Sequence, residues 1–173
     1  MGADQLTLFN ELPPGAARAE LLACCSAPSW AQWMAAGRPY RSAQDAVRHS
    51  AMIVAAMTQD DLAKALAGHP RIGERPDTGH GPRRSAAWSA QEQSGVRTAD
   101  DETVRALAES NREYERRFGH IYLVCASGRS GPELLSLLRS RLRNDAPAEW
   151  QVVRSELQKI NELRLLKLLA GPA

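Results

Sequence analysis

The sequence lacks the features that mark several large classes of protein. Aromatic residues make up 5% of the 173 residues, and the net charge at pH 7 is only +2. Nucleic-acid-binding domains usually carry a strong basic patch or a row of stacking aromatic side chains, so we expect no nucleic acid partner. No apolar run approaches the roughly 18 residues of a membrane-spanning helix, and no secretion signal is present, so we expect no membrane partner and a cytoplasmic location.

Cysteine is equally sparse. The chain has three cysteines, the adjacent Cys24 and Cys25 and the distant Cys125, and they lack the C-x-x-C spacing of a zinc site. We therefore expect three buried thiols, with neither a disulfide framework nor a metal centre. The motifs of P-loop and dinucleotide-binding proteins, zinc proteases and serine hydrolases are also absent, so no metal, nucleotide or serine-nucleophile signature is offered.

What the chain does contain is a succession of amphipathic helices. Apolar residues recur at helical spacing, and capping residues precede the predicted helices, such as Ser42, Thr58, Ser130 and Asp145. No alternating β pattern is present, and the composition of 43% apolar and 24% charged residues is that of a soluble globular protein. The sequence predicts an all-α fold, a single-domain helical bundle over residues 1–173 with about eight to nine helices.

One segment, residues 70–88, interrupts this pattern with three prolines, three glycines and little apolar content. We predict a long loop there, which in a compact domain is usually functional or disordered. Just before it, His69 occupies a position where Leu62 and Leu66 predict an apolar residue. The C-terminal end of a helix would favour the charged form of this imidazole, which makes His69 a candidate proton donor. A histidine satisfied within the core is the alternative.

Two further charged residues stand out. After the loop, Ser89-x-x-Glu92 has the form of a capping box that opens a short helix to Gly95, so Glu92 has either a structural capping role or a chemical one. In the last predicted helix, Arg164 lies within an apolar stripe that includes Ile160. Three interpretations of Arg164 remain open: it binds a ligand carboxylate, pairs with a structural carboxylate, or reaches outward to water.

Five short motifs, taken in order, resemble those of one enzyme family. They are His69-Pro70-Arg71-Ile72-Gly73, Ser89-x-x-Glu92-Gln93-x-Gly95, Asn111-x-x-Tyr114-x-x-x-Phe118-Gly119, Val124-Cys125-Ala126-x-Gly128-Arg129 and Lys159-Ile160-x-x-Leu163-Arg164-Leu165. Each motif alone is weak, but five in order are specific. The family is 2-oxo-4-hydroxy-4-carboxy-5-ureidoimidazoline (OHCU) decarboxylase of urate degradation. The resemblance runs from Phe9 to Arg164, and its form is similar to that of bacterial members.

The resemblance implies an all-α, cofactor-free homodimer that converts OHCU to (S)-allantoin and carbon dioxide. It makes His69 the catalytic acid or base, and Glu92 would either orient His69 or accept a proton. The residues that it implies for substrate binding are Pro70, Ser89, Gln93, Tyr122, Leu123, Val124, Cys125, Ala126 and Arg164. Two alternatives stay open: a hydrolase or isomerase of a related ureido compound, and a non-catalytic helical interaction module.

Overall fold

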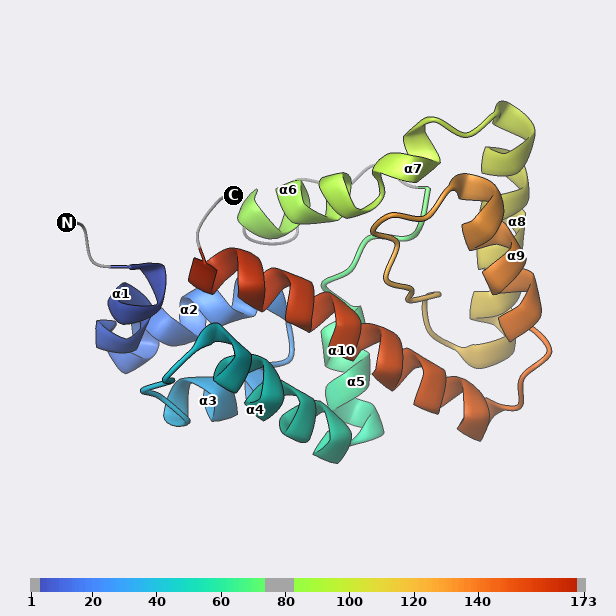
Figure 1. Ribbon diagram of the computed structural model, residues 1–173. Helices are drawn as coiled ribbons and strands as arrows, with labels where there is room; N and C mark the ends of the chain where they lie inside the picture. The colour runs from blue at the N-terminus through green and yellow to red at the C-terminus, as the bar shows by residue number, and fades with distance from the viewer. Residues whose placement is uncertain (1–3, 74–82, 171–173) are drawn as a thin grey trace. The chain divides into compact units, whose positions relative to one another are not determined.

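The computed structural model describes residues 4–73 and 83–170, and within these ranges it contains ten α-helices and no strand (Figure 1). The predicted all-α fold is confirmed. One more helix is present than expected because residues 83–97 form two helices where one was predicted. None of the helices in these ranges is long and apolar enough to cross a membrane.

Contacts within the chain divide it into two compact units. The first unit contains the described residues up to Ala67 together with those from Leu157 onward, and the second contains the described residues of Gly68–Glu156. The helices of the first unit are α1 (Gln5–Glu11), α2 (Pro14–Cys24), α3 (Pro28–Ala36), α4 (Ala43–Ala56) and α5 (Gln59–Leu66). The second unit holds α6 (Arg83–Glu92), α7 (Ser94–Arg97), α8 (Asp101–Phe118) and α9 (Gly131–Arg141), and α10 (Ala146–Ala170) contributes to both.

The predicted helix caps are confirmed. The side chains of Ser42 and Asp145 accept hydrogen bonds from backbone amides in the first turns of α4 and α10. Thr58 and Ser130 each form a complete capping box. These contacts satisfy amides that have no partner inside the helix. The local sequence therefore fixes where these four helices begin.

In the first unit, helices α2, α3, α4 and α5 pack around a core that includes Trp30 and Leu62. Trp30 is fully buried, and its indole N–H donates to the hydroxyl of Ser50, which lies 3.1 Å away on α4. A buried indole requires such an acceptor, since an unmet N–H costs free energy. This bond explains why a serine occupies the apolar face of α4.

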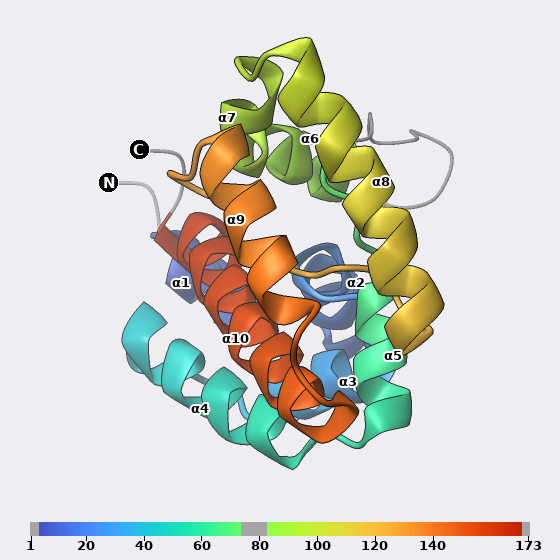
Figure 2. The ribbon, with the colours of Figure 1, turned by 90° about the vertical axis from the view of Figure 1, so that its right-hand side faces the viewer.

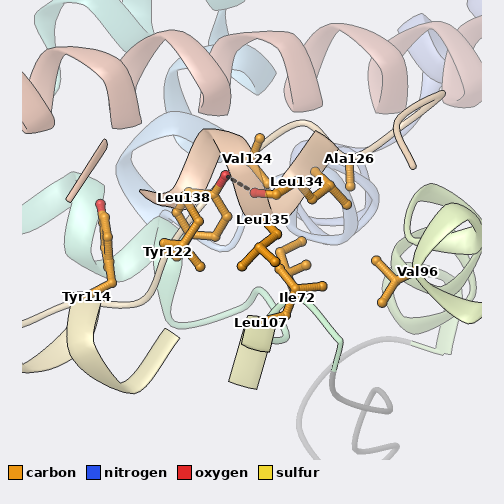
Figure 3. Close-up of a cluster of buried hydrophobic side chains, with 10 residues drawn as sticks. All are labelled: Ile72, Val96, Leu107, Tyr114, Tyr122, Val124, Ala126, Leu134, Leu135 and Leu138. Carbon is orange, nitrogen blue, oxygen red and sulfur yellow. Dashed lines mark hydrogen bonds between the residues drawn. The ribbon is translucent and has the colours of Figure 1, made fainter. Parts of the chain in front are cut away.

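In the second unit, α8 packs against α9 (Figure 2). Their apolar faces, the segment 121–126 and the loop at Ile72 close one core, drawn in Figure 3. The apolar run at 121–126 is not helical, which leaves the extended segment of the two conformations that its length allowed. Its alternate residues Tyr122, Val124 and Ala126 point into the core, as the period of two in an extended chain requires.

Two predicted boundaries are wrong. Helix α6 begins at Arg83, so the final residues of the predicted 70–88 loop are helical; residues 74–82 lie outside the described residues. Helix α5 ends at Leu66, three residues before His69, so the histidine does not lie at the helix C-terminus. The end of α5 therefore gives no reason for His69 to be charged.

Candidate active site

Helix α6 buries a polar face. Ser85, Ser89 and Glu92 are spaced so that they share one side of the helix, and all three are at most 9% exposed. Most surface helices bury their apolar residues and expose the polar ones. A helix that buries two hydroxyls and a carboxylate on one face makes polar contacts there, where most helices make hydrophobic ones.

The predicted capping box at Ser89 is wrong. Ser89 lies in the interior of α6, and Glu92 is the last residue of that helix, so neither belongs to a helix start. The carboxylate of Glu92 instead lies at the C-terminal end, where the helix dipole is negative and an anion is disfavoured. Glu92 therefore does not form a capping box with Ser89 at a helix start.

The loop that carries His69 is held by helix side chains of the second unit. The Asn111 side-chain amide donates to the carbonyl of Ile72 at 2.9 Å. Arg71 forms a two-bond ion pair with Glu115, with nitrogen–oxygen distances of 2.5 and 2.9 Å. His69 itself is half-buried, and its Nε2 atom is shielded from solvent. The loop is therefore fixed at Arg71 and Ile72, just after the histidine and proline.

Gln93 joins the two leading motifs. Its side-chain oxygen accepts a hydrogen bond of 3.1 Å from the amide of Gly73. Gly73 has φ +88°, a left-handed conformation that favours glycine. This conformation explains why the His69–Gly73 motif ends in glycine. The structure thus connects the histidine loop to the residue that follows Glu92.

A second junction joins α7 to the turn after the extended segment. A Cβ atom on Gly95 would lie 2.0 Å from the carbonyl oxygen of Arg129, so only glycine fits there without displacement. Val96, the next residue, packs in the same core as Val124 and Ala126 (Figure 3). The motifs at 69–73, 89–95 and 124–129 are therefore brought together in one unit.

The extended segment 122–126 is buried except at Cys125, which is half-buried. The expectation of three buried thiols therefore holds for Cys24 and Cys25 but not for Cys125. The Tyr122 side chain points into the core, where its hydroxyl donates to the carbonyl of Leu134 at 3.4 Å (Figure 3). Burial raises the pKa of Tyr122 to about 12, so the phenol stays protonated at neutral pH.

Arg164 belongs to the first unit and is only 1% exposed, which excludes a side chain reaching out to water. Its Nη1 atom donates to the carbonyl of Cys24 at the end of α2, at 3.3 Å. The neighbouring Cys25 thiol is buried, and this burial raises its pKa to about 11 although the Arg164 charge acts in the opposite direction. Arg164 is thus buried, and the two interpretations in which it pairs with a ligand carboxylate or a structural carboxylate remain.

A separate cavity of about 260 Å³ lies between the loop at 71–73 and α8. Its lining residues are Arg71, Ile72, Gly73, Val104, Ala108, Asn111, Arg112 and Glu115, and they include none of the predicted site residues. Among residues 4–73 and 83–170, His, Cys, Asp and Glu side chains do not gather in threes as metal ligands.

Sequence reasoning missed two residues that organise these motifs. Asn111 belongs to the third motif, which predicts no role for it, and its bond to Ile72 spans 39 positions of sequence. Glu156 was not singled out, although its carboxylate accepts from the amide of Cys125 at 2.8 Å. The available signal was a polar residue on the buried face of a helix, but its backbone partner lies far away in sequence.

The fold and these three joined motifs define an all-α protein with a buried polar site. The OHCU decarboxylase family profile matches residues 10–166, and the chain belongs to this family. It is 26% identical over 149 residues to the 2-oxo-4-hydroxy-4-carboxy-5-ureidoimidazoline decarboxylase of Amia calva, covering 86% of this chain and 83% of that protein. It is 28% identical over 150 residues to the uric acid degradation bifunctional protein TTL of Arabidopsis thaliana, covering 87% of this chain. The chain spans only 46% of that bifunctional protein.

The fold agrees with solved structures. A crystal structure of OHCU decarboxylase in the presence of (S)-allantoin superposes with a TM-score of 0.77 at 28% identity, covering 88% of this chain and 99% of that chain. A crystal structure of (S)-allantoin synthase superposes with a TM-score of 0.72 at 13% identity. The match covers 96% of this chain and 54% of that chain, and it supports the fold alone.

Proposed function

We propose that this chain decarboxylates OHCU to (S)-allantoin and carbon dioxide. The observation that carries the proposal is the buried polar face of α6 beside the fixed histidine loop, in a chain whose family profile covers residues 10–166. That match includes residues of both compact units, so we treat residues 1–173 as one functional domain. We further infer a homodimer, as the family resemblance implies, and a cytoplasmic location, as the sequence analysis predicted.

The chemistry requires no electron sink from outside the substrate. In OHCU the departing carboxylate is bonded to a carbon next to a C=N group, and this imine accepts the electron pair that is left when carbon dioxide departs. The imine nitrogen takes up a proton, which gives an enol. A second proton must then reach one face of the neighbouring carbon, the former imine carbon, while the substrate hydroxyl loses its proton and becomes a carbonyl. We therefore infer a cofactor-independent reaction in which the protein binds, orients and transfers protons.

We assign these proton transfers to His69 with Glu92. Imidazole is suited to both donation and acceptance near neutral pH, and its loop is fixed by Asn111 and Gln93 contacts. Glu92, buried at the end of α6 and without a capping box at Ser89, either orients His69 or accepts the hydroxyl proton. A single productive orientation would give one enantiomer of allantoin.

We assign substrate binding to the groups that the family resemblance implies. With its oxygen occupied by Gly73, Gln93 has its amide N–H groups to offer to a ureido carbonyl. Ser89 offers a buried hydroxyl, and Pro70 offers a rigid wall next to His69. The backbone of 122–126 would bind the ureido-imidazoline, and Arg164 would hold a carboxylate or oxygen of the substrate in a planar, two-bond contact.

The test is to mix freshly generated OHCU with the protein and follow optical activity together with carbon dioxide release. We expect wild type to give (S)-allantoin, and His69→Ala to lose about 10²–10⁴-fold in rate. His49→Gln is the matched control, because His49 bonds to the Tyr40 hydroxyl in the first unit and glutamine can replace that contact. A racemic product at the spontaneous rate would refute decarboxylase function, and a hydrolysed or isomerised product would favour that alternative.

Glu92→Gln tests the partner of the histidine. Glutamine keeps the size and hydrogen-bonding capacity of the side chain but removes the carboxylate, so we expect kcat to fall while the unfolding midpoint changes little. Urea unfolding and steady-state kinetics on the same preparation measure both quantities. A lower midpoint with unchanged kcat would assign Glu92 to structure and remove it from the mechanism.

A further inference from the structure

We propose that Glu156 is a positioning residue that holds the extended segment 122–126 with its other edge available to the substrate. This inference rests on the proposed function and concerns how the binding segment is kept in place. In an extended chain, the N–H and C=O groups of successive residues point to opposite edges. Leu123 and Cys125 therefore share one edge, and Val124 shares the other with Tyr122 and Ala126.

The edge with Leu123 and Cys125 is occupied by charged side chains. Arg141 Nη1 donates to the Leu123 carbonyl at 2.6 Å. The Cys125 amide donates to the Glu156 carboxylate at 2.8 Å, and the Cys125 carbonyl accepts from Arg129 Nε at 3.1 Å. Hydrogen bonds to ionised groups are stronger than neutral ones, so this edge is firmly held. Of the three contacts, only that of Glu156 engages an amide.

The opposite edge has spare hydrogen-bonding groups. Within the described part of the chain, no hydrogen bond reaches the amide or carbonyl of Val124, or the amide of Ala126. Both residues are buried, at 4% and 3% exposure. Unmet backbone groups in a buried segment cost free energy unless a ligand binds them. Together they offer donor, acceptor and donor in a row, which complements the N–H and C=O groups of a ureido substrate.

The contact with Glu156 fixes the orientation of segment 122–126 about its long axis. Its carboxylate, only 7% exposed, occupies the Cys125 amide and so keeps this donor from the substrate. Without it, the segment could rotate about its long axis, and the register of the Val124 and Ala126 amides would change. Such a displacement of about 1 Å typically costs up to about 10²-fold in activity.

Glu156 can be tested separately from folding, whereas Arg141 cannot. Arg141 also pairs with the fully buried Glu149, so its removal would strand a buried charge. At position 156, glutamine keeps an oxygen acceptor at the same reach, aspartate keeps the charge but withdraws it, and leucine removes the acceptor while retaining apolar volume. The matched control is Glu162→Leu on the same helix, because the Glu162 side chain makes no hydrogen bond within residues 4–73 and 83–170.

The experiment measures KM, kcat and the enantiomeric excess of allantoin, with amide hydrogen exchange over 122–126. We expect Glu156→Leu to raise KM by about tenfold or more, to lower the enantiomeric excess and to speed exchange at Cys125. Glu156→Gln should restore KM to within about threefold of wild type, and Glu156→Asp should fall between them, so an unfolded leucine variant leaves the test intact. Glu162→Leu should match wild type.

The outcomes separate the two proposals. An inactive wild type would overturn the proposed function and this inference with it. An active wild type whose Glu156→Leu and Glu156→Asp variants keep normal KM and enantiomeric excess would overturn the inference alone. A loss of stability with unchanged KM and stereochemistry would also overturn it, because it would assign Glu156 a merely structural role.

Discussion

The buried ion pair of the second unit makes a quantitative prediction about stability. Arg141 is 7% exposed and Glu149 is fully buried. Nε and Nη2 of Arg141 lie 2.8 and 2.5 Å from the same oxygen of Glu149, which also accepts from the Tyr114 hydroxyl. Asn144 donates to the other oxygen at 2.8 Å. Arg141→Leu would therefore leave a buried carboxylate with neutral partners only.

We expect Arg141→Leu to cost about 3–5 kcal/mol of unfolding free energy, the usual cost of breaking one half of a buried pair. With a urea dependence of about 2 kcal/mol per molar, a loss of 4 kcal/mol lowers the unfolding midpoint by about 2 M. Urea titration followed by circular dichroism measures it. The same change frees the Leu123 carbonyl, so the folded variant should also bind OHCU more weakly.

The control is a double-mutant cycle with Glu149→Gln. Glutamine keeps an oxygen for the Tyr114 hydroxyl but carries no charge, so the double variant strands no ion. We expect it to be about 2 kcal/mol more stable than Arg141→Leu, so the losses of the two single variants do not add. If Arg141→Leu costs less than about 1 kcal/mol, or if the two losses simply add, the buried charge is not what stabilises this core.

Three other predictions concern close contacts and buried groups. Gly95→Ala should cost about 1–3 kcal/mol and reduce activity, because its Cβ would lie 2.0 Å from a backbone oxygen, whereas Gly15→Ala meets nothing within 4 Å and should be neutral or stabilising. At pH 8, a thiol reagent should label Cys125 well before the buried Cys25, whose pKa of about 11 keeps it protonated; equal rates in the native state would contradict this assignment. Arg164→Lys keeps the charge but not the planar fork, so KM should rise more than stability falls; a loss of about 3–5 kcal/mol with unchanged KM would mark Arg164 as a structural ion-pair partner.

The sequence predicts well where a structure depends on neighbours in the chain. Capping at Ser42, Thr58, Ser130 and Asp145 is local, because each side chain bonds an amide three residues ahead. The left-handed residue that ends α8 at Gly119 is local for the same reason. These interactions are complete within a few residues, so their residue types are sufficient to locate them.

Prediction failed at α6 because its buried face is polar. The hydrophobic period that reveals most helices is absent from a helix that buries Ser85, Ser89 and Glu92. The capping-box pattern at Ser89 was then the strongest local signal, and it pointed to a helix start that does not exist. A helix that buries polar residues lacks the hydrophobic period from which sequence analysis would predict it.

The need of buried backbone groups for partners explains residues that support the motifs without a predicted chemical role. Irregular segments cannot bond their own backbone groups, so buried ones need partners from elsewhere in the fold. Asn111 supplies one for Ile72, Glu156 supplies one for Cys125, and Gly95 allows a backbone oxygen to approach closely. Each residue breaks the apolar pattern of its own helix in favour of a distant loop. A family motif therefore records two different demands, contact with the substrate and support of the loops that make that contact, and only the tertiary partners separate them.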